Sequence, residues 1–312
     1  MNKLPEKNSA VLITGGSGLI GKYLTSTLLG EGYDVAHLSR KANQFGRVRV
    51  FRWNPEKGVI DPAVFNGIGT IISLAGANIG DGRWTKSRKE AILNSRTSGI
   101  RLLYRTIIEN SIDIKAFISA SAIGYYGSVS SERIFTEEDK PGVGFLGDTC
   151  RLWEEAADLF ASSGIRTVKI RTGVVLEKND SALRKMMIPA KFGLIIRTGS
   201  GRQYMPWIHI SDVCNIYLKA VSDVKMSGAY NAVSPQHSTH NEFMKALARV
   251  LGLPVLLPPA PSFLVKAVLG EMADVVLKGS RVSSQKIINA GYHFSFDNLH
   301  DALTDILMNK KA

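Results

Sequence analysis

The chain has 312 residues, of which 45% are hydrophobic and 21% charged, so it can bury a large core and is expected to form two lobes. Its net charge of +12 favours anionic partners, but lysine and arginine are scattered along the chain, so we expect a phosphate-bearing small molecule and no nucleic acid. A solvated basic surface without a partner is the alternative.

The sequence carries little sign of a membrane span, a signal peptide or a metal site. The longest apolar stretches are interrupted by proline or lysine, which argues against a membrane span, and the first nine residues leave no room for a signal peptide. We therefore expect a cytoplasmic protein. Cys150 and Cys214 have no ligand or disulfide spacing, so we expect neither a metal site nor a disulfide scaffold.

The first predicted strand, Ala10 to Thr14, runs directly into a glycine-rich turn that opens a helix ending near Leu29. Gly15 suits a tight turn, Gly18 lets the backbone approach a pyrophosphate, and Gly21 lets the helix pack against the sheet. The amides at the start of this helix would bind the anion. The expected cofactor contacts in this turn are Gly15, Ser17, Gly18, Leu19, Ile20 and Gly21. A flexible loop without a ligand is the alternative.

The second predicted strand, Val35 to Ser39, indicates which dinucleotide is bound. NAD sites place an acidic residue at the end of this strand, whereas NADP sites use an arginine for the additional phosphate. Here Ser39 is followed by Arg40, while Asp34 lies at the opposite end. The sequence therefore favours NADP(H), with an ordinary exposed basic turn as the alternative.

Further strands alternate with helices. The predicted strands are Val48 to Trp53, Thr70 to Leu74, Ala116 to Ser119 and Thr167 to Arg171, and the predicted helices include Lys86 to Asn110 and a segment around Leu152 to Phe160. Thr239 and Glu242 form a capping box, and Pro254 to Pro261 is interpreted as a linker or an ordered loop.

This alternation predicts an α/β fold: a doubly wound, parallel Rossmann sheet with helices on both faces, followed by a smaller C-terminal substrate-binding domain. We expect an NADP-binding Rossmann domain over residues 1–172, to which residues 207–234 return, and a smaller domain over 173–312. The substrate would lie between the two.

Several blocks resemble the extended short-chain dehydrogenase/reductase superfamily: the glycine-rich turn, Leu74-Ala75-Gly76 and Ser119-Ala120-Ser121-Ala122. A narrower resemblance, covering nearly the whole chain, is to the atypical sugar-nucleotide-epimerase-like subgroup often labelled YfcH-like or SulA-like. The blocks that carry it include Gly82-Arg83-Trp84, Ser95-Arg96, Arg171 to Leu176, Pro206 to Ile210 and Gly279 to Val282.

The resemblance implies a catalytic Tyr-x-x-x-Lys pair that this chain lacks. In that pair the ammonium lowers the pKa of the tyrosine, so the phenol can exchange a proton with a substrate hydroxyl. Leu146 and Cys150 stand at the matching positions, and neither can do this chemistry. Ser121 matches the catalytic serine of the superfamily. Tyr125, or Tyr126 beside it, is a candidate replacement acid/base, with packing as the alternative.

The resemblance also suggests further contacts. In addition to Ser39 and Arg40 at the end of the second strand, expected cofactor contacts are Leu74, Ala75, Gly76, Arg96, Ser119, Arg171 and Val175, and expected substrate contacts are Arg83, Trp84, Gln203, Trp207 and Arg281. A helix-surface salt bridge is the alternative for Arg96, an ion pair between the lobes for Arg281, and core packing for the tryptophans.

His209, Ser211 and Asp212 do not predict a charge relay, because the chain has no Gly-x-Ser-x-Gly turn. We expect a structural histidine, with Ser211 as the N-cap of a helix from Asp212 to Val221. His237 and His240 lack a third ligand, so a metal site is not expected there.

These features predict an NADP-dependent oxidoreductase or epimerase that acts on a phosphorylated or nucleotide-linked small molecule, as a monomer or homodimer. The alternative is a non-catalytic NADP(H)-binding sensor or regulatory protein. An interaction protein without a cofactor is a third possibility, which requires the glycine-rich turn to be vestigial.

Overall fold

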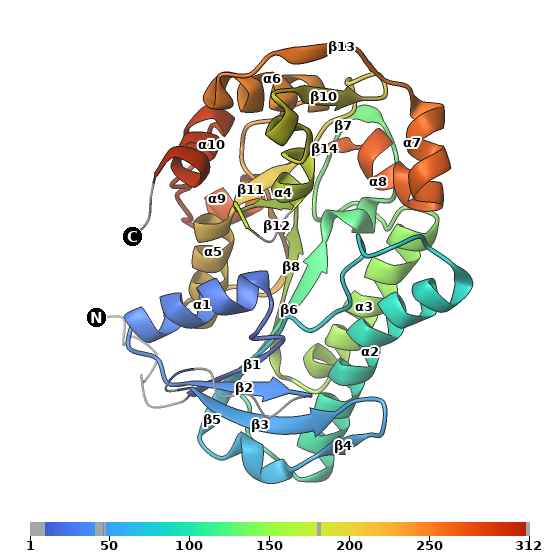
Figure 1. Cartoon of the computed structure of the whole chain (residues 1–312). Coiled ribbons are helices and arrows are strands. Elements are labelled where there is room, and N and C mark those ends of the chain that lie inside the picture. The colour runs from blue at the N-terminus through green and yellow to red at the C-terminus, as the bar shows by residue number, and fades with distance from the viewer. Residues whose placement is uncertain (1–9, 41–45, 47, 180–181, 310–312) are drawn as a thin grey trace.

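The fold was taken from a computed structural model. It describes residues 10–40, 46, 48–179 and 182–309, with only the backbone of residues 256–258 described. Figure 1 shows a large sheet with helices on both sides in one part of the molecule, and shorter strands with several helices in the other.

The large sheet has eight strands and the topology of a Rossmann fold. In spatial order they are β12 (Gly228–Ala232), β8 (Arg166–Thr172), β6 (Ala116–Ala122), β5 (Ile68–Ser73), β1 (Ala10–Thr14), β2 (Val35–Ser39), β3 (Arg49–Asn54) and β4 (Val59–Ile60). All neighbours are parallel except β3 and β4, which pair antiparallel. The predicted parallel sheet is therefore confirmed, with strand ends shifted by three residues or fewer.

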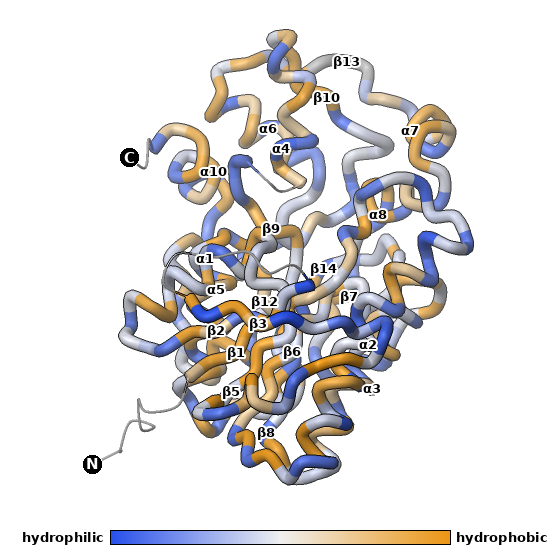
Figure 2. The backbone as a smooth tube through the Cα atoms, turned by 60° about the horizontal axis from the view of Figure 1, so that its bottom comes forward, coloured by the Kyte–Doolittle hydropathy of each residue, from blue (hydrophilic) through white to orange (hydrophobic). Residues whose placement is uncertain are grey.

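The central strands are buried on both faces, because helices cover each side. All five residues of β1 are buried, which explains why its sequence is continuously apolar and does not alternate. Helices α1 (Leu19–Gly30) and α5 (Ile210–Ser222) pack together on one face, and α2 (Lys86–Glu109) and α3 (Phe145–Ser162) on the other (Figure 1). Figure 2 shows the same strands as mainly hydrophobic segments between the helices.

The second part of the molecule contains short paired strands. They are β9 (Val174–Leu176) with β11 (Trp207–His209), β10 (Ile195–Thr198) with β13 (Val255–Ala260), and β7 (Ser131–Phe135) with β14 (Ser280–Val282). The helices of this part are α4 (Ala182–Met186), α6 (His240–Leu251), α7 (Ser262–Leu269), α8 (Ala273–Leu277) and α10 (Leu299–Met308), whereas α9 (Gln285–Asn289) packs on β12 of the large sheet.

The interpretation of the proline-rich stretch as a linker or loop is wrong, because it forms β13. Among the described residues this strand pairs only with β10, and an edge strand tolerates prolines that lack an N–H. The predicted capping box at α6 is confirmed: Thr239 accepts the N–H of Glu242, and the Glu242 carboxylate accepts the N–H of Thr239.

The described residues form two large hydrophobic cores and a small third cluster of Tyr126, Val233 and Val282. One lies around the large sheet, and a second gathers residues such as Leu183, Trp207 and Phe243. The chain returns to the large sheet after the first short strands, because α5 packs on α1 and β12 pairs with β8. These contacts support our proposed division into a Rossmann domain over 1–172 and a smaller domain, with the return to the large sheet beginning at α5, because Trp207–His209 pairs with β9 and Trp207 lies in the second core. Within the described part of the chain, no helix combines the length and apolar character needed to cross a bilayer.

Candidate functional site

The turn between β1 and α1 has the backbone geometry that its glycines predict. Gly15 has a φ of 74°, and a Cβ on it would lie 2.8 Å from the amide nitrogen of Ala75. A Cβ on Gly21 would collide with the carbonyl oxygen of Gly15. The predicted tight turn at Gly15 is therefore confirmed, whereas Gly21 makes room for the start of α1 against Gly15 and Gly16 of the turn itself and not against the sheet.

Gly16 is a further constrained position, which the sequence interpretation missed. A Cβ on Gly16 would lie 2.5 Å from the ring of His37, a buried residue of β2. The Nε2 of His37 is 2.9 Å from Oγ1 of Thr25 on α1, and burial lowers the pKa of the imidazole. His37 was the available signal in the sequence. Its ring projects from β2 toward α1, so the residue packed against the ring must be a glycine.

The N-terminus of α1 is open to an anion. Gly18 is its N-cap residue, and among the described residues no side chain caps this end. The amide of Lys22 makes the first bond of the helix, to the carbonyl of Gly18, so the preceding amides of Leu19, Ile20 and Gly21 lie in the first turn, where an α-helix has no intrahelical acceptors. With the positive end of the helix dipole, these groups fit the pyrophosphate of a dinucleotide. Ser17 and Gly18 are exposed at the same place.

The carboxyl end of β2 is basic. Ser39 is half-buried, Arg40 is exposed, and neither residue there is acidic. Asp34 precedes β2 at the opposite end. This is the arrangement that suits a ribose 2′-phosphate better than a free 2′-hydroxyl.

The residues after β5 lie directly beside the glycine-rich turn. The hydroxyl of Thr14 accepts the N–H of Ala75 at 3.2 Å, and the N–H of Leu74 donates to the carbonyl of Thr14 at 3.1 Å. A Cβ on Gly76 would lie 3.3 Å from Cζ of Arg96. Leu74, Ala75 and Gly76 are therefore brought to the expected edge of the sheet.

Arg96 projects from α2 toward this edge. Its Nη1 donates to the carbonyls of Ala77 at 3.0 Å and Ile92 at 2.9 Å, and its guanidinium lies 5.0 Å from the ring of Trp153. Burial lowers the pKa of Arg96, and the nearby Arg88 acts in the same direction. The hydrogen bonds of Arg96 go to backbone carbonyls, which disfavours the surface salt bridge considered as its alternative.

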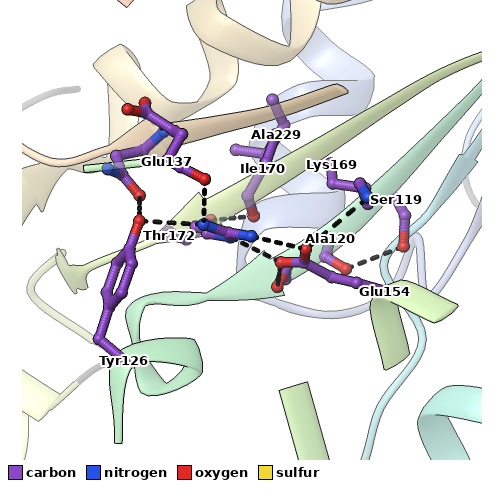
Figure 3. Close-up of polar contacts among 12 residues, drawn as sticks. Ser119, Ala120, Tyr126, Glu137, Glu154, Lys169, Ile170, Thr172 and Ala229 are labelled. Carbon is purple, nitrogen blue, oxygen red and sulfur yellow. Dashed lines mark hydrogen bonds and ion pairs between the residues drawn. The ribbon is translucent and has the colours of Figure 1, made fainter. Parts of the chain in front are cut away.

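A buried ion pair lies below the carboxyl end of β6. Arg171 of β8 binds the carboxylate of Glu154 on α3 through Nε at 2.8 Å and Nη2 at 2.9 Å (Figure 3). The hydroxyl of Ser121 donates to the same carboxylate at 2.7 Å, and Lys169 Nζ lies 3.8 Å from it. Ser121 and Arg171 are each 3% exposed, and both bind the Glu154 carboxylate, so the three residues form a buried hydrogen-bond network. Ser119, also buried, donates to the carbonyl of Ala120 at 2.9 Å.

The two candidate tyrosines differ in their environments. Tyr126 is buried, donates its hydroxyl to Oδ1 of Asn231 at 2.7 Å and accepts Nη1 of Arg171 at 3.1 Å (Figure 3). Burial raises the pKa of Tyr126 to about 12, although Arg171 acts to lower it. Tyr125 is half-buried and its ring lies 3.5 Å from Cζ of Arg171. Burial raises its pKa too, and again Arg171 opposes the rise.

Leu146 and Cys150 lie on α3 near these tyrosines. Leu146 lines a cavity of about 580 Å³ together with Trp84 and Phe145, and the opposite wall comes from the segment between Lys266 and Lys278. Cys150 is buried, and burial raises the pKa of its thiol to about 12, so it stays protonated at neutral pH. Neither side chain can exchange a proton with a substrate there.

The expected substrate residues are not gathered in one place. Trp84 lines the cavity, whereas the adjacent Arg83 donates to the carbonyls of Ala267 and Val268 at the end of α7. Trp207 is fully buried in the second core, and the buried Gln203 donates to the carbonyls of Thr198 and Val276, which favours packing for both.

Arg281 of β14 lies with Cζ 5.5 Å from the ring of Tyr204. Its Nε is buried without a hydrogen-bond partner in the described part of the chain, and no ion pair between the lobes involves it there. Val175 is half-buried in β9, where it pairs with Ile208.

The predicted N-cap at Ser211 is wrong, because α5 begins at Ile210, two residues earlier than predicted. His209 is the N-cap, since its Nδ1 accepts the N–H of Ser211 at 3.2 Å. The Nε2 of His209 lies 3.3 Å from the carboxylate of Asp305. Asp212 is fully buried and accepts hydrogen bonds from Tyr292, Ser295 and Phe296, so the structural interpretation of this group is confirmed. No group of three possible metal ligands occurs among the described residues.

Comparisons with known proteins agree with this geometry. The NAD dependent epimerase/dehydratase family matches residues 11–146, and a domain of unknown function, DUF1731, matches residues 260–306. Epimerase family protein YfhF of Bacillus subtilis is 36% identical and covers 97% of this chain and 99% of its own length. Epimerase family protein SDR39U1 of Mus musculus is also 36% identical, covering 95% and 99%.

A solved structure is similar over almost the same span. The crystal structure of human epimerase family protein SDR39U1 (isoform 2) with NADPH has a TM-score of 0.85 and 31% identity, and covers 96% of this chain and 99% of that one. Its resemblance extends through both parts of the fold. The chain belongs to the NAD-dependent epimerase/dehydratase family and, within it, is related to the epimerase family proteins.

Proposed function

We propose that this protein binds NADP(H) in the edge formed by the glycine-rich turn and the carboxyl ends of β2 and β5. The observation that carries the proposal is the uncapped N-terminus of α1 beside a basic end of β2. The NADPH in the structure of human SDR39U1 supports the same choice of cofactor.

Cofactor binding is tested directly with NADPH, NADP, NADH and NAD at one salt concentration. A ligand that binds only the folded state raises the melting temperature by mass action, so NADPH should raise it more than NADH does. Calorimetry on the same samples gives the affinities. Equal binding of the four nucleotides would contradict the preference, and no binding at all would contradict the cofactor site.

We further propose that the bound cofactor serves an oxidoreductase or epimerase reaction on a phosphorylated or nucleotide-linked small molecule. The nicotinamide supplies or accepts a hydride when bound. Tyr125 would exchange the proton, because it is half-buried and therefore more accessible than Tyr126, whose buried hydroxyl is held by Asn231 and Arg171. The guanidinium of Arg171 lies against its ring and acts to lower the pKa of Tyr125, although burial raises that pKa overall.

In this proposal Ser121 assists the reaction while it keeps its hydrogen bond to Glu154. Its hydroxyl proton goes to Glu154, so the oxygen can still accept a hydrogen bond from a substrate hydroxyl. The cavity beside Trp84 and Leu146 would hold the body of the substrate, and the unpaired Nε of Arg281 is available for an anionic group.

Turnover tests this assignment. Once a metabolite screen with NADPH or NADP finds a substrate, Tyr125→Phe should abolish most of the turnover while leaving cofactor affinity unchanged. Undiminished turnover in that variant would remove Tyr125 as the acid/base.

A second candidate function is a non-catalytic NADP(H)-binding sensor or regulatory protein. Leu146 and Cys150 support it, because they stand where the superfamily has its tyrosine and lysine and neither ionises near neutral pH. A sensor would bind NADPH and show no oxidation of it, even at stoichiometric enzyme, with any metabolite pool. A single turnover with a burst of NADP formation would exclude this second candidate.

We also propose the narrower assignment to the YfcH-like subgroup and a monomeric or homodimeric state. The blocks Gly82-Arg83-Trp84 and Gly279-Ser280-Arg281-Val282 support the subgroup. Light scattering coupled to gel filtration tests the oligomeric state.

A further inference from the structure

The end of β2 has a second basic neighbour that the sequence motif does not reveal. In the parallel pairing of β2 with β3, Ser39 lies opposite Arg52. Adjacent strands of a sheet are about 4.8 Å apart. Two arginines, Arg40 and Arg52, are therefore brought to the same end of the sheet although they are twelve positions apart in the chain.

The face on which Arg52 projects follows from its neighbours. Side chains alternate along a strand, so Ser39 projects on the same face as His37, whose ring contacts α1. Arg52 is in register with Ser39 and shares that face. The next residue, Trp53, confirms the alternation, because its ring lies against Gly99 of α2 on the opposite face. Arg52 thus lies on the side of the sheet that carries the glycine-rich turn.

Neither arginine is already neutralised. Both side chains are exposed, and in the described ranges neither makes an ion pair or a side-chain hydrogen bond. Two uncompensated cations placed together repel each other, and a doubly charged phosphate between them would relieve this repulsion. A guanidinium also offers paired N–H groups that match phosphate oxygens.

We propose that Arg52 is a second binding residue for the 2′-phosphate of NADP(H), acting together with Arg40 and determining the preference over NAD(H). This inference rests on the proposed cofactor function and adds a residue of β3 to it. The phosphate would lie beyond Ser39, between the two guanidinium groups, while the pyrophosphate lies at α1.

The test separates the two halves of the cofactor. Calorimetry is performed with NADPH, with NADH, and with adenosine 2′,5′-bisphosphate, which carries the 2′-phosphate but no nicotinamide. For Arg52→Ala we expect the affinity for NADPH and for the bisphosphate to fall about tenfold or more, with NADH unchanged. The weakening should shrink at high salt, because the lost contact is electrostatic.

Matched variants make the result specific. Arg49→Ala removes an exposed arginine from the opposite end of the same strand and should leave all three affinities unchanged. Arg52→Lys should retain part of the preference, because a point charge remains but the paired donors are lost. The double variant Arg40→Ala/Arg52→Ala should bind NADPH no better than NADH.

The outcomes are distinguishable. If the wild-type chain binds NADPH and Arg52→Ala binds it equally well, the role of Arg52 is overturned and the cofactor proposal stands. If Arg49→Ala weakens NADPH as much as Arg52→Ala does, the effect is one of general surface charge and the inference is again overturned. If the wild-type chain binds none of the three ligands, the proposed cofactor function itself fails.

Discussion

The two ends of the nucleotide edge differ in how their polar groups are used. At the β1 and β2 end, no side chain caps the first amides of α1, and Arg40 and Arg52 make no ion pair or side-chain hydrogen bond in the described part of the chain. At the β6 and β8 end, Ser121, Tyr126, Glu154 and Arg171 satisfy one another in a buried network. The first end is open for a ligand, whereas the second is already closed on itself.

This difference has a physical consequence for function. Polar groups left unpaired at a surface contribute little to the stability of the fold but can bind an anion, which is the expected property of a binding site. Groups paired in a low-dielectric interior resist rearrangement, because breaking one contact leaves the others unsatisfied. Cofactor binding is therefore the better-supported half of the function, and a reacting group is expected at the margin of the network, where the half-buried Tyr125 lies against Arg171.

The largest effect is expected from Arg171→Met, which removes one partner of the buried pair. The carboxylate of Glu154 would remain buried with only Ser121 and the more distant Lys169 as partners. We therefore expect the free energy of unfolding to fall by about 3 kcal/mol or more. Chemical denaturation measures it. Arg151→Ala is the control, since its surface pair with Glu155 should contribute only about 0.5 kcal/mol. If the two substitutions lowered the free energy of unfolding equally, the proposed contrast between the closed and open ends would be wrong.

Gly21→Ala should distort the glycine-rich turn at the open end. The added Cβ collides with the carbonyl of Gly15, so we expect a loss of about 1–3 kcal/mol in stability and a much smaller melting-temperature response to NADPH. Gly30→Ala on the same helix is the matched control, because no atom lies within 4 Å of the new methyl group. A full NADPH response in Gly21→Ala would show that the turn does not hold the cofactor.

The two tyrosines give a finer comparison. Tyr126→Phe leaves Asn231 and Arg171 without a hydroxyl partner and should cost about 1 kcal/mol, whereas Tyr125→Phe should leave the free energy of unfolding nearly unchanged. Urea titration of both variants measures the difference. Destabilisation by Tyr125→Phe alone would reverse the roles assigned to the two residues.

The smallest effect concerns Cys150. Its pKa is raised by burial to about 12 in the folded state, above the value of 9.0 for an exposed thiol. Between these values the unfolded chain binds fewer protons than the folded one, so the contribution to stability is complete below pH 9 and is lost as the pH rises toward 12. Melting temperatures at pH 8 and pH 10 should therefore fall less with pH in Cys150→Ala than in the wild type. Rapid labelling of Cys150 by a thiol reagent in the native protein at pH 8 would contradict its burial.

Much of the fold could be read from local patterns. The apolar runs of β1, β5, β6 and β8 and the capping box of α6 depend on neighbouring residues, so the sequence predicts them well. The stretch from Val255 to Ala260 could not be assigned as a strand, because its prolines are tolerated only by virtue of its edge position beside β10. The N-cap of α5 was misplaced for a related reason, since an imidazole nitrogen replaced the usual hydroxyl.

The sequence by itself determined the dinucleotide turn and the missing Tyr-x-x-x-Lys pair, because both are properties of residues close together in the chain. Tertiary structure alone decided that Gly16 must accommodate His37, that Glu154 binds Arg171, and that Arg52 lies beside Ser39. These pairs depend on strand register and on the packing of α1 and α3 against the sheet, which bring distant segments together and leave no trace in local spacing.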